Sequence, residues 1–173
     1  QVRKIALNSA YGALANQYFA FFNVDLAEAI TTSGQMVIKW AEKTINDYLN
    51  KILQTEDEDY VIAMDTDSVY ITMDKLVSQV FDDDTPKNKI IDFLDTVAKD
   101  KIEDVLTDGF KDLAEYTNAF QQKMEMGREV IADRGIWTAK KRYILNVYDS
   151  EGVRYSEPKL KMMGIETAKS STP

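Results

Sequence analysis

The residues best suited to chemistry in this chain are two aspartates one residue apart, in the run Asp65-Thr66-Asp67-Ser68. Short apolar runs at 60–64 and 69–73 flank them, and two such strands with a short polar link predict a β-hairpin. A hairpin tip holds both carboxylates close together, where they repel each other unless a cation lies nearby. Carboxylate oxygens are ligands that Mg²⁺ prefers, so Asp65 and Asp67 are candidate metal ligands. Aspartate is also common in turns, which leaves a purely structural role open.

A second set of polar residues shares one face of a predicted helix. Residues 2–14 favour helix, and at about 3.6 residues per turn Lys4, Asn8 and Tyr11 lie within about 60° of one another. A cation, an amide and a phenol on one face suit a triphosphate and a base pair, and Gly12 permits close approach. A solvated Lys, a surface Asn and a core Tyr would give the same pattern.

The third set is the basic run Lys140-Lys141-Arg142-Tyr143, with Trp137 just upstream. On a strand, alternate side chains face opposite ways, so Lys141 and Tyr143 would share one face and Lys140 and Arg142 the other. A basic strand with aromatic neighbours suits a nucleic-acid backbone. Further downstream bases extend the same track: Lys159, Lys161 and Lys169. A charged edge strand that resists aggregation is the alternative.

Composition narrows the chemistry. The 173 residues include no Cys and no His, so any metal must be held by oxygen, which favours magnesium. The net charge of −8 opposes binding to a phosphate backbone, but the charge is uneven. Residues 47–115 hold 19 acids and 7 bases, whereas residues 134–169 hold 8 bases and 4 acids. A basic strip of this kind can meet DNA although the whole chain is acidic.

Helices and antiparallel strands are expected to position these sets. A long helix capped by Asp25 should bury one apolar stripe, made of Leu26, Ala29, Ile30, Val37, Trp40, Ala41, Ile45 and Tyr48. Residues 88–121 read as two helices broken near Gly109, and 123–132 and 136–148 as strands around a turn at 133–135, before a turn at 149–152 and a short strand at 153–155. The order predicts an α+β fold whose antiparallel sheet is covered on one face by helices.

Taken together and in this order, the three sets resemble motifs of family B DNA polymerases, in particular those of T-even-type bacteriophages. Lys4-x-x-x-Asn8-Ser9-x-Tyr11-Gly12 matches the fingers-helix motif, and Asp65-Thr66-Asp67-Ser68 matches the palm metal motif. Lys140-Lys141-Arg142-Tyr143 matches the primer-contacting motif. The resemblance implies a division into the end of the fingers helix at 1–16, the palm at 17–158 and a palm-to-thumb segment at 159–173.

The resemblance also implies a two-magnesium nucleotidyl transfer. Asp67 matches the carboxylate that ligates both ions, Asp65 its supporting neighbour, and Glu129 an auxiliary carboxylate. Four residues are expected to bind the incoming nucleotide: Lys4, Asn8, Tyr11 and Gly12. Eight residues are expected to contact primer–template DNA: Thr66, Ser68, Lys140, Lys141, Arg142, Tyr143, Lys161 and Lys169.

Two differences from the family pattern bear on the site. The family usually has Gly before the first Asp of the metal motif, where this chain has Met64. The family's other metal-binding Asp precedes the fingers helix, so one ligand is expected from outside this chain, which alone should be inactive. The remaining polymerase, in a longer parent or a separate subunit, is the expected partner, in a cytoplasmic location. A non-catalytic DNA-contacting or assembly subunit, or an unrelated acidic α+β protein, are the alternatives.

Overall fold

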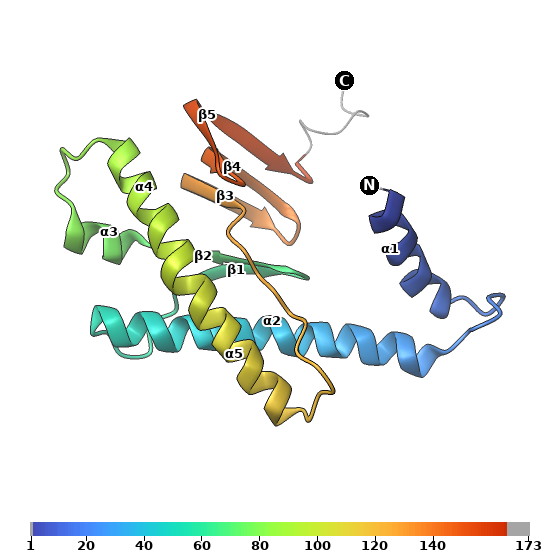
Figure 1. Ribbon diagram of the computed structural model, residues 1–173. Coiled ribbons are helices and arrows are strands. Elements are labelled where there is room, and N and C mark those ends of the chain that lie inside the picture. The colour runs from blue at the N-terminus through green and yellow to red at the C-terminus, as the bar shows by residue number, and fades with distance from the viewer. Residues whose placement is uncertain (1, 166–173) are drawn as a thin grey trace, which may run out of the picture.

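The computed structural model describes residues 2–165, without the side chains of residues 3, 4 and 6–8. It has the α+β fold that the sequence predicts, with helices and antiparallel strands in separate stretches of the chain (Figure 1). The helical elements are α1 (Val2–Leu14), α2 (Val24–Leu53), α3 (Asp74–Val80), α4 (Lys87–Val97), the π-helical segment η1 (Ala98–Ile102) and α5 (Glu103–Tyr116). The strands are β1 (Val61–Asp65), β2 (Ser68–Ile71), β3 (Val130–Ala139), β4 (Arg142–Ser150) and β5 (Val153–Met163).

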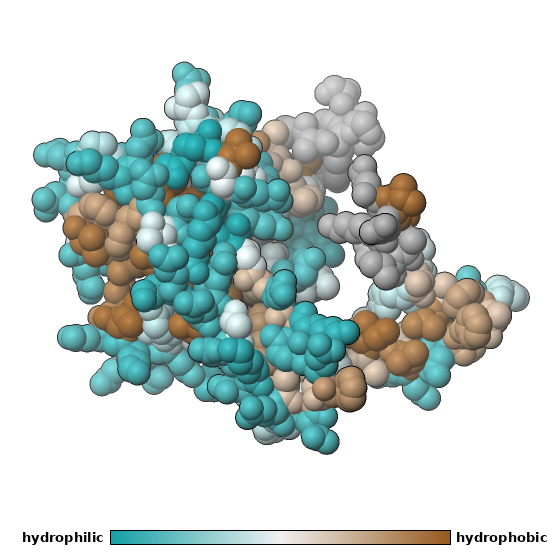
Figure 2. All heavy atoms as spheres, viewed as in Figure 1, coloured by the Kyte–Doolittle hydropathy of each residue, from teal (hydrophilic) through white to brown (hydrophobic). Residues whose placement is uncertain are grey.

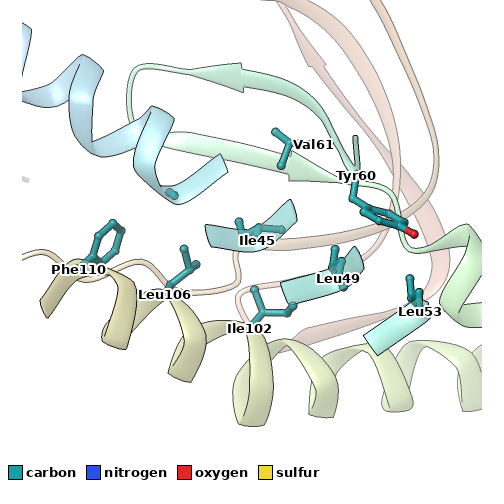
Figure 3. Packing of buried hydrophobic residues seen from close by; sticks show 9 residues of the cluster. Ile45, Leu49, Leu53, Tyr60, Val61, Ile102, Leu106 and Phe110 are labelled. Atoms are coloured by element: carbon teal, nitrogen blue, oxygen red, sulfur yellow. The ribbon is translucent and has the colours of Figure 1, made fainter. Parts of the chain in front are cut away.

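The long helix α2 carries the main core on its C-terminal half. Its buried residues Ile45, Leu49 and Leu53 recur every four positions and pack between the β1–β2 hairpin and α5 (Figure 3). Tyr60, Val61, Ile102, Leu106 and Phe110 complete the cluster. The predicted stripe is correct only in this half, because Leu26 and Ile30 near the start of α2 are 47% and 44% exposed.

The start of α2 differs by two residues from the prediction. Asn23, not Asp25, is the N-cap, and its side chain accepts a hydrogen bond of 2.8 Å from the backbone N–H of Leu26. Asn and Asp cap helices equally well, so the choice depends on which residue has extended backbone geometry. Asn23 has it, with φ −154° and ψ 99°, and Asp25 lies in the first helical turn.

The predicted helix break near Gly109 is wrong. Helix α5 runs through Gly109 without interruption, and the irregularity lies earlier, in the π-helical turn η1. Gly109 is small for a packing reason: a Cβ there would lie 2.8 Å from both Cγ2 and Oγ1 of Thr44 on α2. The close approach also lets the indole of Trp40 donate a 2.8 Å hydrogen bond to the Gly109 carbonyl.

Replacing Gly109 with alanine is expected to destabilise the chain by about 1–3 kcal/mol, because Thr44 presents heavy atoms in two directions and the helices must move apart. Alanine is the better helix former by about 1 kcal/mol, so propensity alone predicts the opposite sign. Gly34→Ala in α2 is the matched control, since no described atom lies within 4 Å of its Cβ position. Urea unfolding should show Gly34→Ala stabilised and Gly109→Ala destabilised; equal gains would contradict the packing argument.

The strands form two antiparallel sheets. β1 and β2 make a hairpin, and β3, β4 and β5 make a three-stranded sheet in that order. In β4 every second residue is buried, from Tyr143 through Leu145 and Val147 to Asp149. The helical layer lies on one side of this sheet (Figure 1). β5 pairs with β4 through Lys159, so the segment from 159 to 163 continues the sheet.

The predicted turn at 133–135 is wrong. Asp133 and Gly135 lie inside β3, where bulges around Ala132 interrupt the pairing without ending the strand. Asp133 is held there by the amide of Asn146, at 2.7 Å, and by Lys87 of α4, at 2.5 Å. The actual turn follows Ala139 and consists of Lys140 and Lys141. The strand before this turn lies further along the chain than predicted, because β3 begins at Val130 and not at Lys123.

None of the helices within residues 2–165 is both long and apolar enough to cross a membrane.

Candidate active site

The two aspartates sit at the tip of the β1–β2 hairpin, as predicted. Asp65 ends β1 and pairs with Ser68, the first residue of β2, so Thr66 and Asp67 form the turn. The backbone N–H and the hydroxyl of Thr66 donate to Asp65 Oδ1, at 2.8 and 3.2 Å. Met64, where the family usually has Gly, packs against the helical core. Its side chain therefore ties the hairpin to that core, and Met64 still pairs with Val69, although the pairing of β1 with β2 is irregular between Val61 and Ala63.

Asp65 is kept ionised. The hydrogen bond from the Thr66 backbone lowers the pKa of the carboxyl by more than burial raises it, and the Thr66 hydroxyl and the charge of Lys141 lower it further. Lys141 Nζ lies 3.9 Å from Asp65 Oδ1. All three partners approach the same oxygen, so Oδ2 is free of described hydrogen-bond partners.

Asp67 is exposed and has no hydrogen bond or ion pair with any residue in the described part of the chain. It borders a cavity of about 120 Å³. The other walls come from the hairpin turn, α2, α5 and the segment before β3: Thr66, Gly34, Val37, Ile38, Phe110, Met124, Glu125 and Met126. An exposed carboxylate without a partner among the described residues is available to a cation or its water shell.

The turn between β3 and β4, Lys140-Lys141 with Arg142 directly after it, is called the basic turn. It lies against the hairpin tip, because Lys141 Nζ is 3.9 Å from Asp65 Oδ1. Lys141 adopts a left-handed conformation, with φ 61°, which turns the chain from β3 into β4. Lys140 and Lys141 are therefore turn residues, and the predicted alternation of their side chains along a strand is wrong. Arg142 opens β4 and is exposed. The turn brings two lysines and one arginine to the edge of the sheet nearest the acidic hairpin.

Tyr143 is buried, with 7% of its surface exposed. Its ring packs in edge-to-face fashion on Tyr70 of β2, at 5.5 Å between centroids, and Trp137 of β3 lies 5.4 Å from the same Tyr70. Burial raises the pKa of Tyr143, and the Tyr70 hydroxyl and the charges of Asp65 and Glu129 add to the shift. The aromatic trio thus joins the hairpin to the three-stranded sheet. A DNA contact by Tyr143 stays a prediction.

Glu129 immediately precedes β3. Its side chain is 69% exposed, and its carboxylate lies 3.8 Å from the ammonium of Lys161 on β5. Its carbonyl accepts a 2.6 Å hydrogen bond from the Glu151 N–H, which fixes the start of β3 beside the β4–β5 turn.

The expected nucleotide-binding residues lie on α1. Positions 4, 8 and 11 share one face of this helix, and Tyr11 is 41% exposed. No described atom lies within 4 Å of a Cβ built on Gly12. In Figure 1, α1 stands apart from both sheets, joined to the N-terminal end of α2. Lys169 falls outside the described residues.

The donor set fits magnesium. Carboxylate oxygens with free lone pairs are what Mg²⁺ takes from protein, usually one or two at a time. Asp67 and the Oδ2 atom of Asp65 meet that requirement. Among residues 2–165, no three acidic side chains come close enough together to form a complete metal cage.

An ionic network that the sequence did not predict joins β4, α4 and the segment before β3. Asp149 is 1% exposed and accepts hydrogen bonds from Arg128, from Arg154 Nε at 3.2 Å and from the Gly152 N–H at 3.0 Å. Arg128 also pairs with Asp95 of α4. Asp149 continues the two-residue spacing of buried positions in β4, and this spacing could have revealed it. The run Asp149-Ser150-Glu151-Gly152 indicated a turn instead.

Comparison with known proteins names the class to which this α+β fold and its acidic hairpin point. The chain matches the sequence profile of DNA polymerase family B over residues 1–82, which include α1 and the whole β1–β2 hairpin. By sequence, this part of the chain is therefore similar to DNA polymerase family B.

Two phage proteins are similar over nearly its whole length. The DNA-directed DNA polymerase of Escherichia phage RB69 is 47% identical over 182 residues, which cover 99% of this chain and 20% of the relative. The DNA-directed DNA polymerase of Enterobacteria phage T4 is 44% identical over 180 residues, with the same coverage. This chain therefore spans about a fifth of the length of these relatives.

Proposed function

We propose that the chain is the palm portion of a DNA-directed DNA polymerase, together with the end of its fingers helix. The observation that carries the proposal is the meeting of Asp65 with Lys141, which joins the acidic hairpin to the basic turn. An acidic tip suits metal-bound phosphates, and an adjacent basic turn suits the DNA backbone. The 47% identity to a phage DNA-directed DNA polymerase supports the same assignment.

Asp67 and Asp65 would hold magnesium at the hairpin tip, with Glu129 as an auxiliary carboxylate. When bound, the two ions would activate the primer 3′ hydroxyl and neutralise charge on the incoming triphosphate. Thr66 orients Asp65 by its two hydrogen bonds, so the supporting carboxylate stays ionised and directed. Asp67 lacks such support within the described residues, which suits a direct ligand. A further carboxylate ligand would come from the remainder of the polymerase.

The other expected residues would contact the nucleotide and the DNA. On α1, Lys4 and Asn8 would contact the triphosphate, and Tyr11 with Gly12 would line the nascent base pair. Lys140, Lys141 and Arg142 would contact the primer backbone from the turn, with Lys161 and Lys169 further along. Thr66 and Ser68 belong to the hairpin, and Tyr143 of β4 packs on the hairpin through Tyr70.

An exposed apolar surface supports the remainder of the polymerase as a partner. Tyr18 is 88% and Phe21 75% exposed, on the loop between α1 and α2. Brown, apolar spheres gather at this corner in Figure 2. Aromatic residues with few charges are typical of the buried centre of protein interfaces. The same surface supports the second candidate function, a non-catalytic subunit that assembles with a catalytic one.

Replacing Lys140, Lys141 and Arg142 together with alanine is expected to remove most primer–template binding by the chain. For every phosphate that the variant no longer neutralises, the slope of log affinity against log salt should become shallower by about 0.9. Fluorescence anisotropy across a salt titration measures both quantities. A variant with Lys43, Lys51 and Lys111 changed to alanine has the same net charge and is the control. Equal binding by the two triple variants would contradict a DNA contact at this turn.

A further inference from the structure

The end of β5 touches the basic turn at a glycine. Met163, the last residue of β5, pairs with Tyr143, so Gly164 comes next to the start of β4. Gly164 has φ 61°, in the left-handed region that glycine adopts without steric cost. The chain thus leaves the sheet at Gly164, directly beside Lys141 and Arg142.

A side chain at Gly164 would overlap the backbone of the basic turn. A Cβ built there collides with the carbonyl oxygen of Lys141 and lies 3.3 Å from both the Lys141 carbonyl carbon and Arg142 Cγ. A flexible side chain could move aside, but a backbone carbonyl moves only with its whole turn. The absence of a side chain at Gly164 therefore decides where the peptide between Lys141 and Arg142 can lie.

The turn itself has an unusual residue at its tightest point. Lys141 has φ 61°, a conformation that favours glycine or asparagine at the end of a hairpin loop. Strain of this kind persists where the surroundings hold it and where the side chain is used. The Lys141 ammonium reaches Asp65 Oδ1 at 3.9 Å, close to the outer limit of an ion pair. A small shift of the turn would separate them.

We propose that Gly164 is a positioning residue: by leaving space for the Lys141 carbonyl, it holds the basic turn against the acidic hairpin. Lys141 then remains beside Asp65 and, under the proposed function, at the primer end. Only the place of Lys141 at the primer end rests on the proposed function. The placement of Lys141 by Gly164 concerns residues of this chain alone and can be tested without DNA or metal.

Zero-length crosslinking with a carbodiimide measures the placement. The reagent joins an ammonium and a carboxylate that are in contact, so Lys141 and Asp65 should yield an amide-linked peptide pair detectable by mass spectrometry. In Gly164→Ala this product is expected to fall several-fold. The pair Lys87–Asp133, at 2.5 Å between α4 and β3, is an internal reference whose yield should stay constant.

Gly152→Ala is the matched control. Gly152 has φ 84° at the β4–β5 turn, so alanine there is strained too, but no described atom lies within 4 Å of the Cβ position. The Lys141–Asp65 product should persist in Gly152→Ala. An unchanged product in Gly164→Ala, or an equal loss in both variants, would overturn the proposal.

If Gly164→Ala folds poorly, a second variant decides. Lys141→Gly removes the side chain that constrains the turn, which can then give way to the new Cβ. The melting temperature of Gly164→Ala should be largely recovered in the Gly164→Ala, Lys141→Gly double variant. No recovery would overturn the proposal.

Primer–template binding separates this inference from the proposed function. Gly164→Ala and Lys141→Ala should weaken binding by similar factors, and the double variant should be no weaker than either, because both act through one ammonium. Loss of the crosslink with unchanged DNA affinity would uphold the placement of Lys141 by Gly164, and would show that Lys141 does not contact DNA.

Discussion

Replacing Asp67 with asparagine is expected to lower the rate of nucleotide incorporation at least about a thousandfold, in a polymerase completed by the segments that family members carry outside this stretch. Asparagine has nearly the same shape but no charge. Because Asp67 makes no hydrogen bond or ion pair within the described residues, the substitution should leave the hairpin intact. The loss should therefore appear in the chemical step and not in stability. Single-turnover incorporation over magnesium and nucleotide titrations is the measurement.

Three controls sharpen this test. Asp83→Asn removes one exposed negative charge on a distant loop and should leave the rate unchanged. Asp65→Asn should cost less than Asp67→Asn, because Asp65 is the supporting carboxylate. The 173-residue chain alone should incorporate no nucleotide, since its two hairpin carboxylates cannot complete the site. A near-normal rate for Asp67→Asn in a folded, active assembly would reject the hairpin as the catalytic metal site.

The acidic hairpin could be predicted because every signal for it is local. The apolar runs beside Asp65 and Asp67 are short and polar residues separate them, so strand, turn and strand follow from adjacent residues. Helices α1 and α2 were predicted for the same reason. The mistakes at Gly109 and Gly135 have a common cause. Both glycines suggested a local break, but each leaves room for a side chain of a neighbouring element: Thr44 of α2 at Gly109, and Leu145 of β4 at Gly135, where Trp137 of β3 itself packs as well.

The meeting of the basic turn with the hairpin could not be read from local patterns. It depends on where the three-stranded sheet lies on the hairpin, which the packing of Tyr70 with Trp137 and Tyr143 determines. The run of bases around Lys141 looked like a continuous strand, because no glycine or asparagine announces the turn there. Gly164, which contacts this turn, lies more than twenty residues further along the chain, so its contact could not be predicted from the residues around Lys141.

The largest expected loss of stability follows from Asp149→Ala. This carboxylate is 1% exposed and lies between Arg128 and Arg154, so its removal leaves the buried Arg128 guanidinium with Asp95 as its remaining acidic partner. Removing one partner of a buried ion pair costs about 3–5 kcal/mol. Urea unfolding monitored by circular dichroism measures the change. Asp108→Ala breaks the exposed Asp108–Lys111 pair and should cost less than about 1 kcal/mol.

The pH dependence of unfolding tests the same carboxylate independently. Burial alone would raise the pKa of Asp149, but hydrogen bonds from Arg128 and Arg154 outweigh it and hold the pKa below the ordinary value of 3.8. A carboxyl whose pKa is lower in the folded state stabilises the fold above the unfolded pKa and loses that contribution as pH falls through the folded one. The parent should thus lose stability more steeply than Asp149→Ala below about pH 4. Parallel acid profiles for the two proteins would contradict this account. So would a loss of less than about 1 kcal/mol in the free energy of unfolding at neutral pH, because the ion pairs of Asp149 would then not stabilise the contact between the sheet and α4.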